Sequence, residues 1–294
     1  MALTLATETF TRFERLSFVT RRDAQAGLGG EHRSRRRAPS TDFTDYRPYQ
    51  PGDDFRRVDW NIYGRLGTLQ VKLTEARERL DVALVLDCSA SMAWGKPDKL
   101  EFAASIVAAL GYVALARSDA VRVVCLREGQ EPAVLGPLRG RARLPDLMRF
   151  VSQAKSEGRV DLNTALAECM PSSDSSQRLV VLVSDLLTPD GMASGLDRLL
   201  GQRTDVVVLH VFSPDEQDPT LAGEIELLDA ESGDVLELGA SLATLDAYRA
   251  RYRTWQEEQA AACTSRGLRY VRLSTDRPLT SVVLDDLRSA QVLR

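Results

Sequence analysis

The sequence predicts an α/β fold with a doubly wound, mostly parallel sheet. From residue 81 onward, apolar runs of strand length alternate with segments of helix length, which is the pattern of a parallel sheet covered by helices on both faces. Two of these runs, VALVL at 82–86 and LVVLV at 179–183, are apolar throughout, as expected of strands buried on both sides. These observations predict one α/β domain over residues 77–294.

The elements of this domain follow in order along the chain. Asp98 and Glu101 form a capping box before the first helix, which is apolar nearly all round and therefore predicted to be buried. Leu245, Tyr252 and Trp255 recur at helical spacing in the last long helix. The expected strands are 82–87, 120–126, 178–187, 205–212 and 268–274, and the expected helices are 99–117, 144–154, a short one from 162, 190–201, 240–266 and 279–290.

Two segments depart from the alternating pattern. Apolar runs on either side of a polar turn predict a β-hairpin insertion over 223–239. Residues 1–76 are expected to form an N-terminal extension, with strands at 43–48 and 68–76 between which a helix runs from Asp53, as its cap, to about residue 65.

Composition excludes several classes of function. The chain has 294 residues, 44% of them hydrophobic, and a net charge of −4, which is typical of a soluble globular protein. The sequence contains no apolar run of membrane-spanning length and no secretory signal pattern, so we expect no membrane span and a cytoplasmic location. Its four cysteines are widely spaced and form no C-x-x-C pair, which favours reduced thiols. With two histidines, the chain offers little material for histidine catalysis or histidine metal sites.

The motif D-x-S-x-S directly follows the first buried strand of the domain. Asp87, Ser89 and Ser91 place one carboxylate and two hydroxyls on a tight turn. Hard divalent cations prefer such oxygen ligands, and ligands of open α/β sheets usually lie at the carboxyl ends of the strands. A polar turn with serine caps is the structural alternative. The pattern indicates a metal site and shows no nucleophile.

A second strand, at 178–187, ends in Ser184-Asp185, so Asp185 should emerge on the same sheet edge as Asp87. The two strand ends together resemble the metal-ion-dependent adhesion site of von Willebrand factor A domains. That resemblance implies a divalent cation, Mg²⁺ in the first place and Ca²⁺ or Mn²⁺ as alternatives, with Asp185 acting directly or through water. The family also uses a threonine on a middle loop. Here Val160 stands at that position, and Asp161 or Thr164 is left to substitute.

A longer motif precedes this domain. R-x-Y-x-P-G-D-D-x-R-x-x-D-W over 47–60, followed by Gly64-Arg65, Leu69-x-Val71-Lys72 and DCSASM, resembles domain-of-unknown-function family 58. The resemblance covers roughly residues 15–290. It implies a von Willebrand factor A-like domain and a partner among the MoxR-type AAA+ ATPases. The alternating charges of 47–60 indicate an ion-pair network that docks the extension onto the domain, with direct partner binding as the alternative.

Three functions compete. The leading hypothesis is a non-enzymatic, metal-dependent protein-interaction module, partner or adaptor of a MoxR-type ATPase in the assembly or maturation of other proteins. The alternative is a metal-dependent hydrolase of phosphate esters, but Ser89 stands where such enzymes carry a second acid and no lysine follows Lys155. Nucleic-acid binding through the basic residues 33–37 is the weakest option, because the cluster lacks aromatics and is better explained as a solvated loop.

Overall fold

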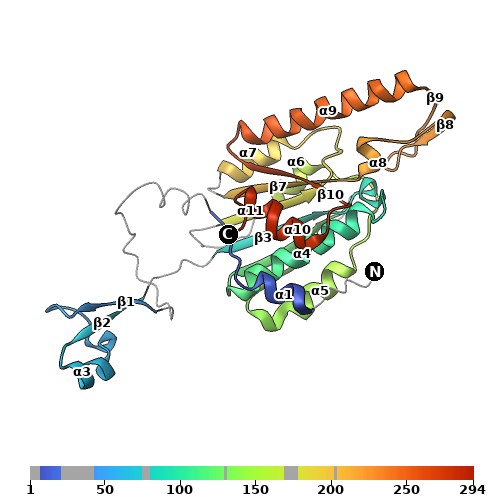
Figure 1. Cartoon of the computed structure of the whole chain (residues 1–294). Coiled ribbons are helices and arrows are strands. Elements are labelled where there is room, and N and C mark those ends of the chain that lie inside the picture. The colour runs from blue at the N-terminus through green and yellow to red at the C-terminus, as the bar shows by residue number, and fades with distance from the viewer. Residues whose placement is uncertain (1–6, 21–42, 75–79, 129–130, 169–177, 202–203) are drawn as a thin grey trace. The chain divides into compact units, whose positions relative to one another are not determined.

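The computed structural model describes residues 7–20, 43–74, 80–128, 131–168, 178–201 and 204–294 (Figure 1). Contacts between residues divide the chain into two compact units. The small unit comprises residues 29–78, and the large unit comprises residues 1–28 and 79–294. Each unit is described by itself.

The large unit is built on a six-stranded sheet with the order β10-β7-β6-β3-β4-β5. All neighbours pair in parallel except β4 and β5, which are antiparallel. This sheet confirms the predicted doubly wound, von Willebrand factor A-like fold, with β3 and β6 at its centre. The strands are β3 (Asp81–Asp87), β4 (Ala120–Leu126), β5 (Ala133–Leu138), β6 (Arg178–Ser184), β7 (Asp205–Phe212) and β10 (Arg269–Ser274).

Helices cover both faces of this sheet (Figure 1). Leu84 and Leu86 of β3 point into a core shared with the helices of one face, whereas Ala83 and Val85 point into a second core on the other face. This alternation follows from the two-residue period of a strand. The first face carries α1 (Thr7–Phe13), α4 (Lys99–Ala116), α5 (Leu144–Ser152), α10 (Leu279–Ser281), a π-helical turn (Val282–Asp286) and α11 (Leu287–Ser289); the second carries α6 (Leu162–Glu168), α7 (Ala193–Gly201) and α9 (Leu242–Thr264).

Helix α4 is the central helix of the first face. Asp98 caps it by accepting a hydrogen bond from the Glu101 backbone N–H at 2.6 Å, as the capping pattern predicts. Its length and composition would let it cross a membrane, but 83% of the helix is buried inside the protein. A helix surrounded by core side chains needs no polar face, which explains why its sequence is apolar all round.

The structure adds elements that the sequence pattern does not predict, among them an edge strand and an N-terminal helix. Strand β5 contains Gly136 and Pro137, which interrupt an apolar run; proline is tolerated there because β5 lies at the edge of the sheet. Helix α1 contributes Phe13, which is fully buried in the first core. This helix belongs to the residues that the sequence groups with the N-terminal extension, yet it packs in the large unit.

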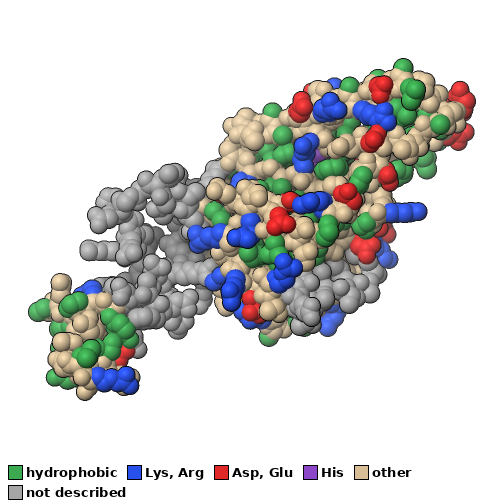
Figure 2. Space-filling model, in the orientation of Figure 1, with side chains coloured by type: hydrophobic (Ala, Val, Ile, Leu, Met, Phe, Trp, Pro, Cys, Tyr) green, Lys and Arg blue, Asp and Glu red, His purple; other side chains and the backbone are tan. Residues whose placement is uncertain are grey.

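The predicted hairpin is present. Strands β8 (Gly223–Leu228) and β9 (Val235–Ala240) pair antiparallel, after the short helix α8 (Pro214–Gln217) and before α9. Tyr248 of α9 donates a hydrogen bond to the Glu216 carbonyl of α8 at 2.7 Å, so α9 is attached to the segment that leads into the hairpin. Acidic side chains gather at the end of the large unit that carries this hairpin (Figure 2).

The small unit pairs β1 (Phe43–Pro48) with β2 (Gln70–Thr74) in antiparallel fashion, around a 3₁₀ turn at Phe55–Arg57 and helix α3 (Trp60–Leu66). The expected continuous helix from Asp53 is wrong. Val58 is extended and interrupts it, and Asp59 caps α3 by accepting from the N–H groups of Asn61 and Ile62. Asp53 instead binds Arg47, with an Nη1–Oδ2 distance of 2.7 Å.

Candidate metal site

Asp87 and Ser184 lie side by side at the carboxyl edge of the sheet. Leu86 and Val183 are partners in the parallel register of β3 and β6, so the next residue of each strand reaches the same level. The Ser184 hydroxyl donates to Asp87 Oδ2 at 2.6 Å and accepts from the Leu186 N–H at 2.9 Å. Ser184 thus fixes the orientation of the Asp87 carboxylate, a role that sequence reasoning did not assign to it.

The D-x-S-x-S turn brings its three side chains together. The Ser89 N–H donates to Asp87 Oδ1 at 2.9 Å, which closes the turn. The hydroxyl oxygens of Ser89 and Ser91 lie 3.0 Å apart. Asp87 and Ser89 are buried, whereas Ser91 is half-buried at the rim. The two hydroxyls therefore lie together on this turn, and the Ser89 side chain also interacts with the Asp87 carboxylate.

The environment of Asp87 disfavours its charge. Burial raises the pKa of Asp87 to about 6, with a further contribution from the nearby Asp185 carboxylate, against the opposing effect of hydrogen bonds from Ser184 and Ser89. A divalent cation beside Asp87 would stabilise its ionised form. The raised pKa thus follows from burial and from the neighbouring negative charge of Asp185.

Asp185 is buried at the same edge but has a different partner. Lys99 Nζ donates to Asp185 Oδ2 at 2.6 Å, and the Leu187 N–H donates to Oδ1 at 3.1 Å. The same ammonium group also binds Glu216 of α8, whose second oxygen accepts from the Ser213 N–H at 2.9 Å. The candidate ligand Asp185 is therefore held in a buried ion pair.

Sequence reasoning missed Lys99 and Glu216 as members of this site. Lys99 is the first residue of α4 and was treated only as part of that helix, while its partners lie 86 and 117 residues further along the chain. The sequence carries one signal for this pair, the position of Lys99 at the start of a helix. Because the helix dipole disfavours a cation there, a nearby acid is expected to compensate for it.

The middle loop lies against the D-x-S-x-S turn. The Ala90 N–H donates to the Gly158 carbonyl at 2.7 Å, and the Glu157 N–H donates to the Cys88 carbonyl at 2.9 Å. Gly158 has φ +66°, and a Cβ there would collide with the Glu128 side chain at 1.9 Å. The position of the loop relative to the turn therefore depends on this glycine.

The two candidate ligands of the loop, Asp161 and Thr164, are hydrogen-bonded to each other. Val160 is buried in the second core and offers no ligand atom. Asp161 is exposed and caps α6, because its Oδ1 accepts from the Asn163 N–H at 2.9 Å and its Oδ2 from the Thr164 hydroxyl at 2.6 Å. The Thr164 hydrogen bond also lowers the pKa of Asp161.

The hairpin turn reaches toward the same site. Glu231 is half-buried, although every other residue from 226 to 237 is exposed. Burial raises the pKa of Glu231, an interaction with the Ser91 hydroxyl lowers it, and the negative charges of Asp185 and Asp87 raise it again. Asp229 accepts from the N–H groups of Glu231 and Ser232, each at 2.8 Å, and thereby shapes the turn.

The side chains at this edge fit a divalent cation only in part. Asp87, Ser89 and Ser91 offer an anionic and two neutral oxygen ligands of the kind that Mg²⁺ and Ca²⁺ accept. Asp185 is engaged by an ammonium group, and Asp161 serves as a helix cap. Within the described part of the chain, no three His, Cys, Asp or Glu side chains group closely enough to hold a metal. The donor set is that of an open site rather than a closed one.

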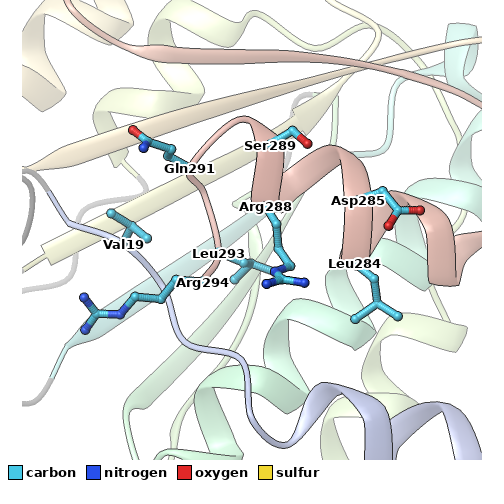
Figure 3. A pocket seen from close by; sticks show the side chains of 8 residues that line it. All are labelled: Val19, Leu284, Asp285, Arg288, Ser289, Gln291, Leu293 and Arg294. Atoms are coloured by element: carbon cyan, nitrogen blue, oxygen red, sulfur yellow. The ribbon is translucent and has the colours of Figure 1, made fainter.

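A hollow of the large unit lies elsewhere. It has a volume of about 620 Å³, and Figure 3 shows Val19 together with side chains of the C-terminal turns around it. Arg269, the first residue of β10, donates to the carbonyls of Val19 and Gln291, so this hollow lies near the amino ends of the strands. It contains none of the candidate ligands.

The histidine of β7 and three of the cysteines are packed in the core. His210 of β7 is fully buried, with 2.5 Å between its Nδ1 and the Tyr270 hydroxyl oxygen. Cys88, Cys125 and Cys263 are buried free thiols, whereas Cys169 lies outside the described residues. The basic cluster at 33–37 also lies outside them.

Comparisons with known proteins place the chain in a family. Uncharacterised proteins of Mycobacterium tuberculosis and Mycobacterium bovis are 26% identical to it over 267 residues, which cover 89% of this chain and 83% of theirs. Among solved structures, the conserved hypothetical protein BatB of Bacteroides thetaiotaomicron is 14% identical, with a TM-score of 0.44, over 72% of this chain and 98% of that chain. An aerotolerance-related membrane protein of Bacteroides fragilis is 16% identical, with a TM-score of 0.44, over 71% and 99%.

The model of a protein family matches residues 45–262. This match begins in β1 of the small unit and ends in α9 of the large one. It therefore includes the 47–60 motif, the D-x-S-x-S turn, Asp185 and the hairpin. Because the match spans most of the chain, the protein belongs to the family described as Protein of unknown function DUF58.

Proposed function

We propose that this protein is a non-enzymatic interaction module that binds a partner through a divalent cation, Mg²⁺ in the first place. The observation that carries the proposal is that the Ser89 and Ser91 hydroxyls lie 3.0 Å apart on the turn that is closed by the hydrogen bond from the Ser89 N–H to the Asp87 carboxylate, at the carboxyl edge of the sheet. This edge is where open α/β sheets bind their ligands. Asp87 and the two serines would hold the cation.

The donor set supports a bridging cation rather than a structural one. Mg²⁺ demands six oxygen ligands and usually keeps several waters. When bound, it would offer an open coordination position to a carboxylate oxygen of another protein. A site with Asp87 as its one proposed anionic ligand gives modest affinity alone, which suits a contact that a partner completes.

We further propose that the partner is a MoxR-type AAA+ ATPase, and that the complex acts in the cytoplasm in the assembly or maturation of other proteins. The resemblance stated for the 47–60 motif supports this identity; the site residues support only an acidic partner. The hairpin beside the site offers additional contact area, because its residues Leu227, Leu228, Val235 and Leu236 are exposed.

The alternative function, hydrolysis of phosphate esters, gains one supporting observation. Lys99 places a lysine at this edge of the sheet, where the sequence beyond residue 155 offers none. Its side chain is nevertheless fully buried, and its ammonium group is occupied by two carboxylates, so it does not present a cation to a substrate. Ser89 also occupies the position at which such enzymes carry their second acid. We therefore favour the interaction module.

The test is an association measurement with a MoxR-type ATPase of the same organism. We expect a complex in the presence of Mg²⁺, and at least tenfold weaker binding, about 1.4 kcal/mol, with a chelator or with Asp87→Ala. Circular dichroism must show that the variant is folded. If folded Asp87→Ala binds the ATPase as tightly as wild type, a metal bridge is excluded. Turnover of p-nitrophenyl phosphate that Asp87→Ala abolishes would favour the hydrolase.

A further inference from the structure

Lys99 is an unusual residue in the large unit. It is the first residue of α4, and its side chain is fully buried. A cation at a helix N-terminus is disfavoured by the helix dipole, and a buried ammonium group loses its hydration. Both costs indicate that its two carboxylate partners, Asp185 and Glu216, are what keep it in place.

Two carboxylates hold the Lys99 ammonium group. Its Nζ donates to Asp185 Oδ2 at 2.6 Å and also binds Glu216. The site therefore contains a positive charge bound to Asp185, one of its candidate acidic ligands. Asp87, in contrast, receives hydrogen bonds from Ser184 and Ser89, and among the described residues no Lys or Arg forms an ion pair with it.

We propose that Lys99 is a built-in cation that holds Asp185 out of the metal shell and thereby keeps the metal affinity of the site low. This inference rests on the metal site proposed above. The cation is then held by Asp87, Ser89 and Ser91, and a partner's carboxylate supplies the second negative charge that Asp185 withholds. The affinity of oxygen sites for divalent cations follows the number of charged ligands, so the pairing of Lys99 makes tight metal binding depend on the partner.

The pairing also connects the site to the hairpin segment. Lys99 joins Asp185, at the end of β6, to Glu216 of α8, which leads into β8. Glu216 in turn accepts from the Ser213 N–H, as one half of a capping box. A substitution of Lys99 therefore leaves the buried Asp185 and the half-buried Glu216 without their cation, and the experiment must separate this effect from the effect on the metal.

The experiment is a titration of the full-length protein with Mn²⁺ and Mg²⁺ alone. Binding is measured by calorimetry and by the metal-induced shift in melting temperature. Lys99→Met removes the charge but keeps the aliphatic chain. Lys99→Met/Glu216→Gln also removes one of the two orphaned charges and supplies a folded variant if the single one is unstable. Lys96→Met, at an exposed lysine three residues earlier, is the matched control.

We expect Lys99→Met and the double variant to bind the metal at least tenfold more tightly than wild type and to gain a larger thermal shift, with Lys96→Met unchanged. Adding Asp87→Ala should remove this gain. Equal affinities of wild type and a folded Lys99 variant overturn the role of Lys99 and leave the metal site standing. A gain that survives Asp87→Ala, or no binding by any variant, overturns the metal site itself.

Discussion

His210 makes stability depend on pH in a defined window. Burial lowers the pKa of His210 to about 4 from its ordinary value of 6.5, with Asp185 raising it and Lys99 and Arg272 lowering it further. The unfolded chain therefore binds more protons than the folded one between these values. The stabilisation is complete above pH 6.5 and is lost as the pH falls toward 4, and it amounts to about 3 kcal/mol.

The variant His210→Gln removes this titration. We expect the difference in unfolding free energy between wild type and variant to shrink by about 3 kcal/mol from pH 7 to pH 4, measured by urea denaturation. Asp87, whose pKa is raised, titrates in the same window but contributes equally to both proteins. A difference that stays constant with pH would show that His210 does not titrate on unfolding.

Asp59 stabilises the small unit through three hydrogen bonds. It caps α3 by accepting from the Asn61 and Ile62 N–H groups, and it accepts from the Tyr46 hydroxyl at 2.9 Å. Asp59→Ala should lower the unfolding free energy of this unit by about 1–3 kcal/mol. Chemical denaturation measures this change. Asp54→Ala, at the exposed cap of the 3₁₀ turn, is the control, and equal losses in the two variants would contradict this ranking.

The strands and long helices could be predicted because each carries its own signal. An apolar run buried on both faces, or a helix with a capping box, is visible in a few adjacent residues. The interrupted helix of the small unit was not predictable in this way, because the hydrogen bond between Asp59 N–H and Gln70 O links two distant segments. The edge strand β5 was missed because Gly136 and Pro137 mask its pattern.

For the candidate site, too, the local part was predictable and the long-range part was not. Asp87, Ser89 and Ser91 lie within five residues of each other, and the ends of parallel strands explain why Asp185 joins them at one edge. The pairing of Lys99 with Asp185 and Glu216 was not predictable, because it depends on the packing of α4 and α8 against the sheet. Long-range ion pairs leave no periodic signal in a sequence.

The hairpin should respond to the metal through Glu231, the one residue of 226–237 that is not exposed. Its carboxylate interacts with Ser91 and with the charges of Asp87 and Asp185, so it adds to the negative potential of the site. Glu231→Gln should weaken Mn²⁺ binding by about threefold in calorimetry. Glu237→Gln, exposed on the same hairpin, should leave it unchanged; an equal effect of both would assign the result to net charge alone.

The whole chain combines a metal-binding candidate in the large unit with a small unit whose function is a separate question. The sequence predicts that the residues of the 47–60 motif dock the small unit onto the large one. That docking stays a prediction, since the structure divides the two into separate compact units. It requires that Asp59→Ala, which weakens the small unit, also increases hydrogen exchange at the surface of the large unit.

The most direct test is calorimetric titration of the full-length protein with Mg²⁺ and Mn²⁺. Asp87→Asn keeps the volume of the side chain and removes its charge, and Asp81→Asn makes the same change at the opposite end of the same strand. We predict one weak binding site in wild type and in Asp81→Asn, and at least tenfold weaker binding in Asp87→Asn. Equal metal binding by wild type and folded Asp87→Asn would contradict a metal site at the end of β3.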